Sequence, residues 1–125
     1  MGGFDPARVS SAVAGALAGP GGVALVVRVF AGVPGVVLTP ARRGVFRSQP
    51  ERIQIGDLRY EVAGDGRLSA AHVVGGVVIA EEVLPAGSVG PHIARALGQI
   101  AVRYGATVVP NIEAAVEALN TSAGL

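Results

Sequence analysis

The amino-acid sequence predicts an α+β domain. We expect an N-terminal helix, a mostly antiparallel meander sheet of five or six strands, and two C-terminal helices packed on one face of that sheet. Apolar residues recur at helical spacing near both ends of the chain, whereas the middle alternates apolar and polar residues. Helices that are segregated from antiparallel strands in this way pack against one face of the sheet. The length of 125 residues fits a single domain over 1–125.

The first third of the chain predicts one helix and two strands. Asp5-Pro6 is a helix start signal, and helix 6–18 ends at Gly19–Gly22. Val23–Ala31 is β-branched and almost entirely apolar, so we expect a strand buried on both faces. A type II turn at 33–35 should return the chain into a strand over 36–39, because Pro and Gly occupy the two central positions of that turn.

The middle of the chain predicts a meander. A short strand is expected at Gly44–Arg47, followed by Arg52–Ile55 and Leu58–Ala63 on either side of a turn at 56–57. The alternation in the last two strands indicates one buried and one solvated face. The expected inward residues are Ile53, Ile55, Leu58, Tyr60 and Val62.

The longest apolar run after the N-terminal third is Leu68–Leu84, with Gly75-Gly76 at its centre. A Gly-Gly pair between β-branched runs favours a two-residue hairpin, because both turn residues can adopt positive φ. The hairpin would pair 74 with 77, 72 with 79 and 70 with 81. The alternative is one long strand with a bulge at the glycines.

Two helices complete the expected fold. Ser88 and Pro91 mark the start of the first, and Gly105 fits its C-terminal cap. Thr107–Val109 is expected to be an extended link, and Asn111 to cap the second helix. The expected buried positions are Ile93, Leu97, Ile100, Ala101 and Tyr104 in the first helix, and Ile112, Ala115, Val116 and Leu119 in the second.

The composition favours association with another chain. Apolar residues make up 50% and charged residues only 15%, below the usual fraction of about 25%. Too few charges remain to cover a small monomer, so apolar surface is expected against a partner, most simply a second copy. The opposing interpretation is that small Ala and Gly residues raise the apolar count without forming patches. Either way, the net charge of +1 provides no global field for nucleic acid or membranes.

The same composition indicates the setting of the protein. The sequence holds no cysteine, which excludes disulfides and thiol catalysis, and every basic residue is Arg. With the abundance of Ala, Gly and Val, this is typical of a high-GC bacterial genome, and we expect a cytoplasmic protein. Neither a signal peptide nor a membrane span is expected, because the N-terminus lacks a basic segment and Gly19–Gly22 interrupts the apolar stretch.

His72 and Glu81 are the candidate catalytic residues. In the expected hairpin they lie diagonally on neighbouring strands, where a carboxylate could orient the imidazole for acid–base chemistry. The alternative is a solvated sheet histidine. His92, at the next helix start, could ligate a metal together with His72 and the Glu81-Glu82 pair, but no HxxxH or HExxH spacing supports this. We therefore predict no metal site and no cofactor.

The other candidate site is the cluster Arg42, Arg43, Arg47 and Arg52, which could bind phosphate or nucleic acid around Phe46. Against nucleic acid, the chain as a whole is neither basic nor rich in aromatic residues.

The sequence thus favours a non-catalytic domain that acts by self-association or through a protein partner. The alternatives are a small apolar-ligand-binding module, with a pocket between the sheet and the C-terminal helices, and phosphate or nucleic-acid binding through the Arg42–Arg52 segment.

Overall fold

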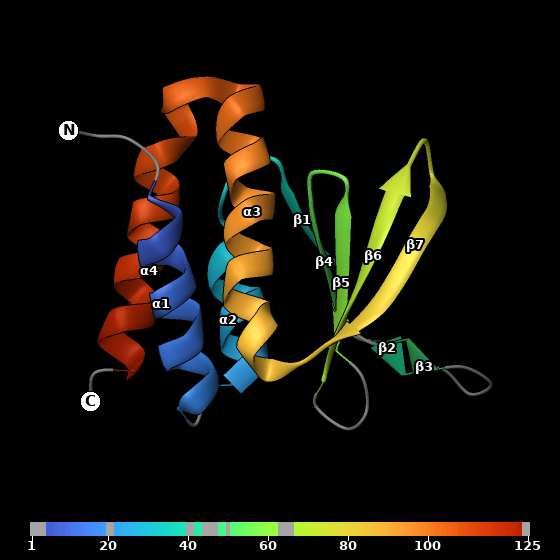
Figure 1. The fold of residues 1–125 in the computed structure, drawn as a ribbon, viewed down its shortest axis with the longest axis horizontal. Coiled ribbons are helices and arrows are strands. Elements are labelled where there is room, and N and C mark those ends of the chain that lie inside the picture. The colour runs from blue at the N-terminus through green and yellow to red at the C-terminus, as the bar shows by residue number, and fades with distance from the viewer. Residues whose placement is uncertain are drawn as a thin grey trace.

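The computed structural model describes residues 5–19, 22–39, 42–43, 48–49, 51–62 and 67–123. All the long helices lie on one side of a five-stranded antiparallel sheet with strand order β1-β4-β5-β6-β7 (Figure 1). Helices α2 and α3 contact strands of the sheet, whereas α1 and α4 pack against these two helices from the far side (Figure 1). The predicted α+β class, with a meander sheet between an N-terminal helix and C-terminal helices, is confirmed.

Helix α1 (Pro6–Ala18) begins where the sequence predicts. The Asp5 side chain accepts hydrogen bonds from the backbone N–H groups of Ala7 and Arg8, and Pro6 occupies the first helical position. An N-cap of this kind is worth about 1 kcal/mol, because it satisfies donors that have no partner inside the helix.

The predicted strand Val23–Ala31 is wrong, because this segment is helix α2 (Gly22–Phe30). Val26, Val27 and Phe30 are buried at helical spacing, whereas Arg28 is exposed. A short run that is apolar at nearly every position has no alternation to separate a buried strand from a buried helix. Packing against other elements determines that this segment is a helix, since α2 is covered by α1 and α4 on one side and contacts β1 on the other.

The turn after α2 and the first strands of the meander follow the prediction. The Val36 N–H donates to the Val33 carbonyl over 3.0 Å, and Gly35 adopts φ +88°, as a type II turn requires. Strands β1 (Val36–Thr39), β4 (Arg52–Ile55) and β5 (Leu58–Val62) then pair in antiparallel order. The predicted inward residues of β4 and β5 are buried or packed against the core.

A separate two-stranded ribbon consists of β2 (Arg42–Arg43) and β3 (Ser48–Gln49). The strand predicted at Gly44–Arg47 lies outside the described residues.

Strands β6 (Leu68–Val74) and β7 (Val77–Leu84) form the predicted hairpin, in which Val74 pairs with Val77 and both turn glycines have positive φ. The predicted register is wrong further along the hairpin. His72 pairs with Ala80 instead of residue 79, and Ala70 pairs with Glu82 instead of residue 81. Ile79 is an extra residue on β7, so a bulge shifts every later pair by one.

Helix α3 (Ala86–Tyr104) begins before the expected start, so Pro91 lies inside it. Gly105 ends the helix with φ +75°. The predicted buried residues of α3 pack inward except Tyr104, which is half exposed.

The extended link expected at Thr107–Val109 is wrong, because Gly105–Val108 forms the short 3-10 helix η1 and α4 (Val109–Ala123) follows directly. Asn111 is therefore a residue of the first turn of α4 and not its cap. The predicted buried stripe of α4 is confirmed.

One hydrophobic core joins the sheet to the helices, and its largest fully buried side chains include Tyr60, Phe30 and Leu97. Within the described ranges, the helices include none with the length and apolar character needed to cross a bilayer.

Two glycines in the first turns of α3 make a matched test of helix packing. A Cβ on Gly90 would lie 2.7 Å from the Ser10 backbone oxygen of α1, whereas a Cβ on Gly87 would meet nothing within 4 Å. We expect Gly90→Ala to lower the free energy of unfolding by about 1–3 kcal/mol through overpacking. Gly87→Ala should leave it unchanged or raise it by up to about 1 kcal/mol. Urea unfolding measures both, and equal effects would contradict close α1–α3 packing at this point.

Candidate functional site

A buried tyrosine and a histidine meet where α3 crosses the sheet. The Tyr60 hydroxyl lies 2.7 Å from Nδ1 of His92, and the two rings pack edge to face. Tyr60 comes from the middle of β5, and its position opposite Ile53 and Ala70 directs its ring towards the helices. Burial raises the pKa of the Tyr60 hydroxyl well above its ordinary value, so it stays protonated and can donate a hydrogen bond.

Glu82 on β7 favours one of the two tautomers of neutral His92. Its Oε1 lies 3.6 Å from Nε2 of His92. A carboxylate opposite Nε2 favours a proton on that nitrogen, which leaves Nδ1 to accept the hydrogen bond from Tyr60. Burial lowers the pKa of His92 below 6.5, with a smaller opposing effect of Glu82 and a lowering effect of Arg95. The imidazole is therefore neutral at pH 7, with its Nε2–H directed to the carboxylate.

His92 and Glu82 border a cleft of about 310 Å³ between the inner face of the sheet and the start of α3. Its apolar lining consists of Leu58, Ala70 and Ala80, and its polar lining consists of His72, Glu81, Glu82 and His92. Strands β6 and β7, which supply most of this lining, diverge from α3 towards their turn (Figure 1). A small polar site thus lies beside small apolar side chains.

The predicted pairing of His72 with Glu81 does not match this arrangement. His72 lines the cleft with an exposed side chain, but its diagonal neighbour on the same face is Glu82, because the bulge at Ile79 shifts the register. Glu81 also borders the cleft, but it stands opposite Ala71, so it does not share a sheet face with His72. Sequence reasoning missed the contact between Tyr60 and His92. The sequence feature that could have indicated this contact is the predicted inward position of Tyr60, because a buried hydroxyl needs a hydrogen-bond partner.

The cleft residues do not form a metal centre. Within the described ranges, no three His, Cys, Asp or Glu side chains are grouped closely enough to hold a metal ion.

The outer strand β7 carries an exposed apolar surface. It is the last strand in the order of the five-stranded sheet, and only its final residue is buried. The β7 edge surface is defined here by four branched side chains with exposed fractions of 40–62%, namely Val77, Val78, Ile79 and Val83. Figure 1 shows that the β6–β7 hairpin diverges from α3 towards its turn, so none of the drawn helices lies against its tip. Exposed branched residues on an edge strand are typical of a site for strand pairing.

The opposite edge of the sheet is different. Strand β1 is only four residues long, contacts α2, and exposes one large apolar side chain, Val37.

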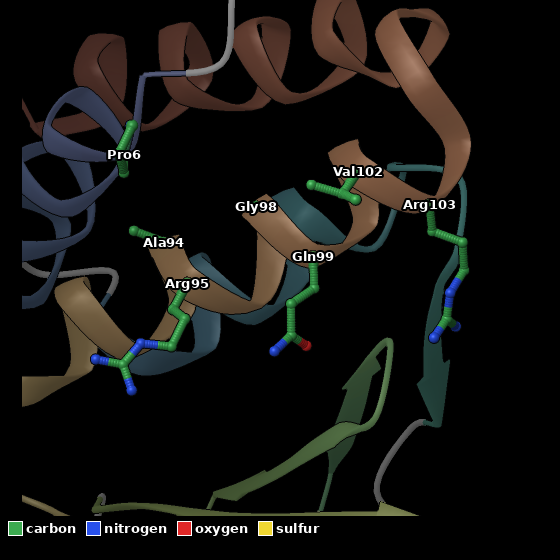
Figure 2. Close-up of a pocket in the computed structure, with 7 residues that line it drawn as sticks. All are labelled: Pro6, Ala94, Arg95, Gly98, Gln99, Val102 and Arg103. Carbon is green, nitrogen blue, oxygen red and sulfur yellow. The ribbon is translucent and has the colours of Figure 1, made fainter.

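A second, larger hollow of about 670 Å³ runs along α3 (Figure 2). Pro6 of α1 borders it at one end, and Ala94, Gly98 and Val102 follow one stripe of α3 (Figure 2). Arg95, Gln99 and Arg103 follow a neighbouring stripe, and their side chains extend towards the sheet in Figure 2. Arg103 approaches Asp57 at 3.9 Å. This larger hollow lies on the α3 surface, whereas the cleft beside His92 lies between the sheet and α3.

The predicted arginine site is described only in part. Arg52 lies on β4, where its guanidinium is 3.2 Å from the carboxylate of Glu61. The backbones of Arg42 and Arg43 form β2, and Arg47 lies outside the described residues. Binding of phosphate or nucleic acid by this segment stays a prediction.

The buried position of His92 predicts a pH dependence of stability. Its pKa is lower in the folded protein than the ordinary value of 6.5, so the unfolded chain binds this proton more tightly. Stability should fall as the pH decreases through 6.5, and His92→Gln should reduce that fall. Urea unfolding at pH 7 and pH 5 measures it. His72→Gln, at the exposed histidine of the same cleft, is the matched control, and an equal effect of both substitutions would contradict this assignment.

Comparison with known proteins identifies the family of the chain but not its activity. The searches of curated proteins and of solved structures each found no match. The model of one family, described as a domain of unknown function (DUF5073), matches residues 1–121. Because this match covers nearly the entire sequence, the chain belongs to the DUF5073 family.

Proposed function

We propose that this protein acts by self-association, with the β7 edge surface of one copy pairing with that of a second copy. The observation that carries the proposal is the exposure of Val77, Ile79 and Val83 on the last strand of the sheet. Burial of such side chains stabilises an interface by about 25 cal/mol for each Å² of apolar area removed from water. The low fraction of charged residues, 15%, supports the same proposal.

A second copy fits this edge because an antiparallel strand pair is self-complementary about a two-fold axis. Strand β7 has eight residues, enough for a run of main-chain hydrogen bonds between copies. The two five-stranded sheets would then form one continuous sheet. Pairing of this kind satisfies edge N–H and C=O groups as well as covering the branched side chains.

Glu81 and Glu82 restrict the register of this pairing. A two-fold axis at either residue would place identical carboxylates opposite each other, and like charges directly opposed in a sheet are destabilising. The axis is therefore expected nearer Val78 and Ile79, so that apolar side chains of the two copies meet.

A charge on β7 should prevent this association. We expect Val77→Lys to yield a monomer of 12.4 kDa under conditions where the unsubstituted protein has twice that mass, because lysine at an edge opposes strand pairing. Light scattering after size-exclusion chromatography, over a dilution series, measures the mass.

The matched control is Val37→Lys on the opposite edge strand, where exposure is 61% compared with 62% at Val77. This variant should keep the doubled mass. A monomeric unsubstituted protein at every concentration, or equal disruption by both variants, would contradict pairing through β7. If the protein forms a stable complex with a different protein and no dimer with itself, the β7 edge surface would be assigned to that other partner.

A further inference from the structure

The cleft beside His92 presents a hydrogen-bond donor and an acceptor side by side. With Nδ1 occupied by Tyr60, the Nε2–H of His92 is the donor and Oε1 of Glu82 is the acceptor, 3.6 Å apart. This separation is long for a hydrogen bond between the two groups themselves. Each retains capacity for an additional partner, and the Glu82 side chain is two-thirds exposed.

Few chemical groups can form one hydrogen bond with the His92 donor and one with the Glu82 acceptor at the same time. A ligand needs an acceptor and a donor on neighbouring positions, as in a primary carboxamide or a lactam, whose carbonyl oxygen and N–H lie on the same edge. A carboxylate has no donor for Glu82, and the negative charge of Glu82 would repel it. An ammonium group has no acceptor for the Nε2–H.

We propose that this cleft binds a ligand that carries a carboxamide or lactam edge, with its carbonyl accepting from His92 Nε2–H and its N–H donating to Glu82. The volume of about 310 Å³ accommodates a single ring, and Leu58, Ala70 and Ala80 supply apolar surface for it. His72 stands at the same cleft, so a planar ring would lie near an exposed imidazole.

Tyr60 is a positioning residue in this site. Its hydroxyl contacts His92 and not the ligand, and it holds the tautomer that exposes the Nε2–H to the cleft. Its hydroxyl also lies 3.4 Å from the His92 carbonyl oxygen, which further ties β5 to the start of α3. The site is therefore assembled before a ligand arrives, which limits the entropy lost on binding. This inference does not depend on association through β7.

The test uses benzamide as the probe, with N,N-dimethylbenzamide and benzoate as matched compounds that lack the N–H donor. Nuclear magnetic resonance titration of the full ¹⁵N-labelled chain at pH 7.5 reports where each compound binds. We expect benzamide to shift the backbone signals of Ala70, Ala80 and His92, with a dissociation constant on the order of millimolar for a fragment of this size. The other two compounds should shift them much less.

Two variants assign the contacts. Glu82→Ala should weaken benzamide binding by about fivefold or more, the effect of one hydrogen bond, whereas Glu113→Ala at an exposed position of α4 should not. In Tyr60→Phe, long-range ¹H–¹⁵N spectra of the His92 ring should show a shift away from the Nε2–H tautomer, together with weaker binding. The backbone spectrum of each variant shows whether it is folded.

Two results would overturn the proposal. One is equal binding of benzamide and its dimethyl derivative. The other is benzamide affinity that is unchanged in a folded Glu82→Ala protein, or absence of shifts around the cleft at the solubility limit of benzamide.

Discussion

The β6–β7 hairpin is supported by the rest of the molecule over only part of its length, and both candidate sites follow from this. At its base, Leu68 and Leu84 are buried under the helices. Towards the turn, the hairpin diverges from α3 (Figure 1). Strand β7 is left with exposed branched side chains, and the cleft beside His92 borders its inner face. A single geometric feature thus creates an interaction surface and a small polar cavity.

The position of His92 depends on packing away from the cleft. Gly90 of α3 comes so close to Ser10 of α1 that a methyl group would not fit, and this contact fixes the first turns of α3. Two residues later, the His92 ring reaches Tyr60 across the interface between helix and sheet. Because Tyr60 is buried with its hydroxyl hydrogen-bonded, the contact avoids the cost of an unsatisfied polar group.

Turn chemistry and alternation made much of the fold predictable from the sequence. Gly75-Gly76, the Asp5 cap and the alternating strands β4 and β5 each depend on local interactions that residue types report directly. The segment Val23–Ala31 was not predictable in this way, because a uniformly apolar run suits either a buried helix or a buried strand. The environment of that segment is set by packing against α1, which directly precedes it, and against α4, which is distant in sequence.

The candidate site was predictable only in part. The two histidines and the Glu-Glu pair were recognisable from the sequence as candidate functional residues. Which of them lie close together depends on the bulge at Ile79, and no glycine or other turn residue in the sequence indicates that bulge. One extra residue on β7 makes Glu82, and not Glu81, the carboxylate that shares a sheet face with His72 and approaches His92. The contact between His92 and Tyr60 joins residues 32 positions apart, and it requires the placement of α3 on the sheet.

Backbone amide hydrogen exchange, followed residue by residue over a range of protein concentrations, tests the central claim most directly. If β7 pairs with a second copy, amides of Val77–Leu84 that point away from β6 should become protected as the concentration rises. Amides of β1, at the other edge of the same sheet, should exchange at a constant rate. Exchange in β7 that does not change with concentration, or protection that rises equally at both edges, would contradict the account.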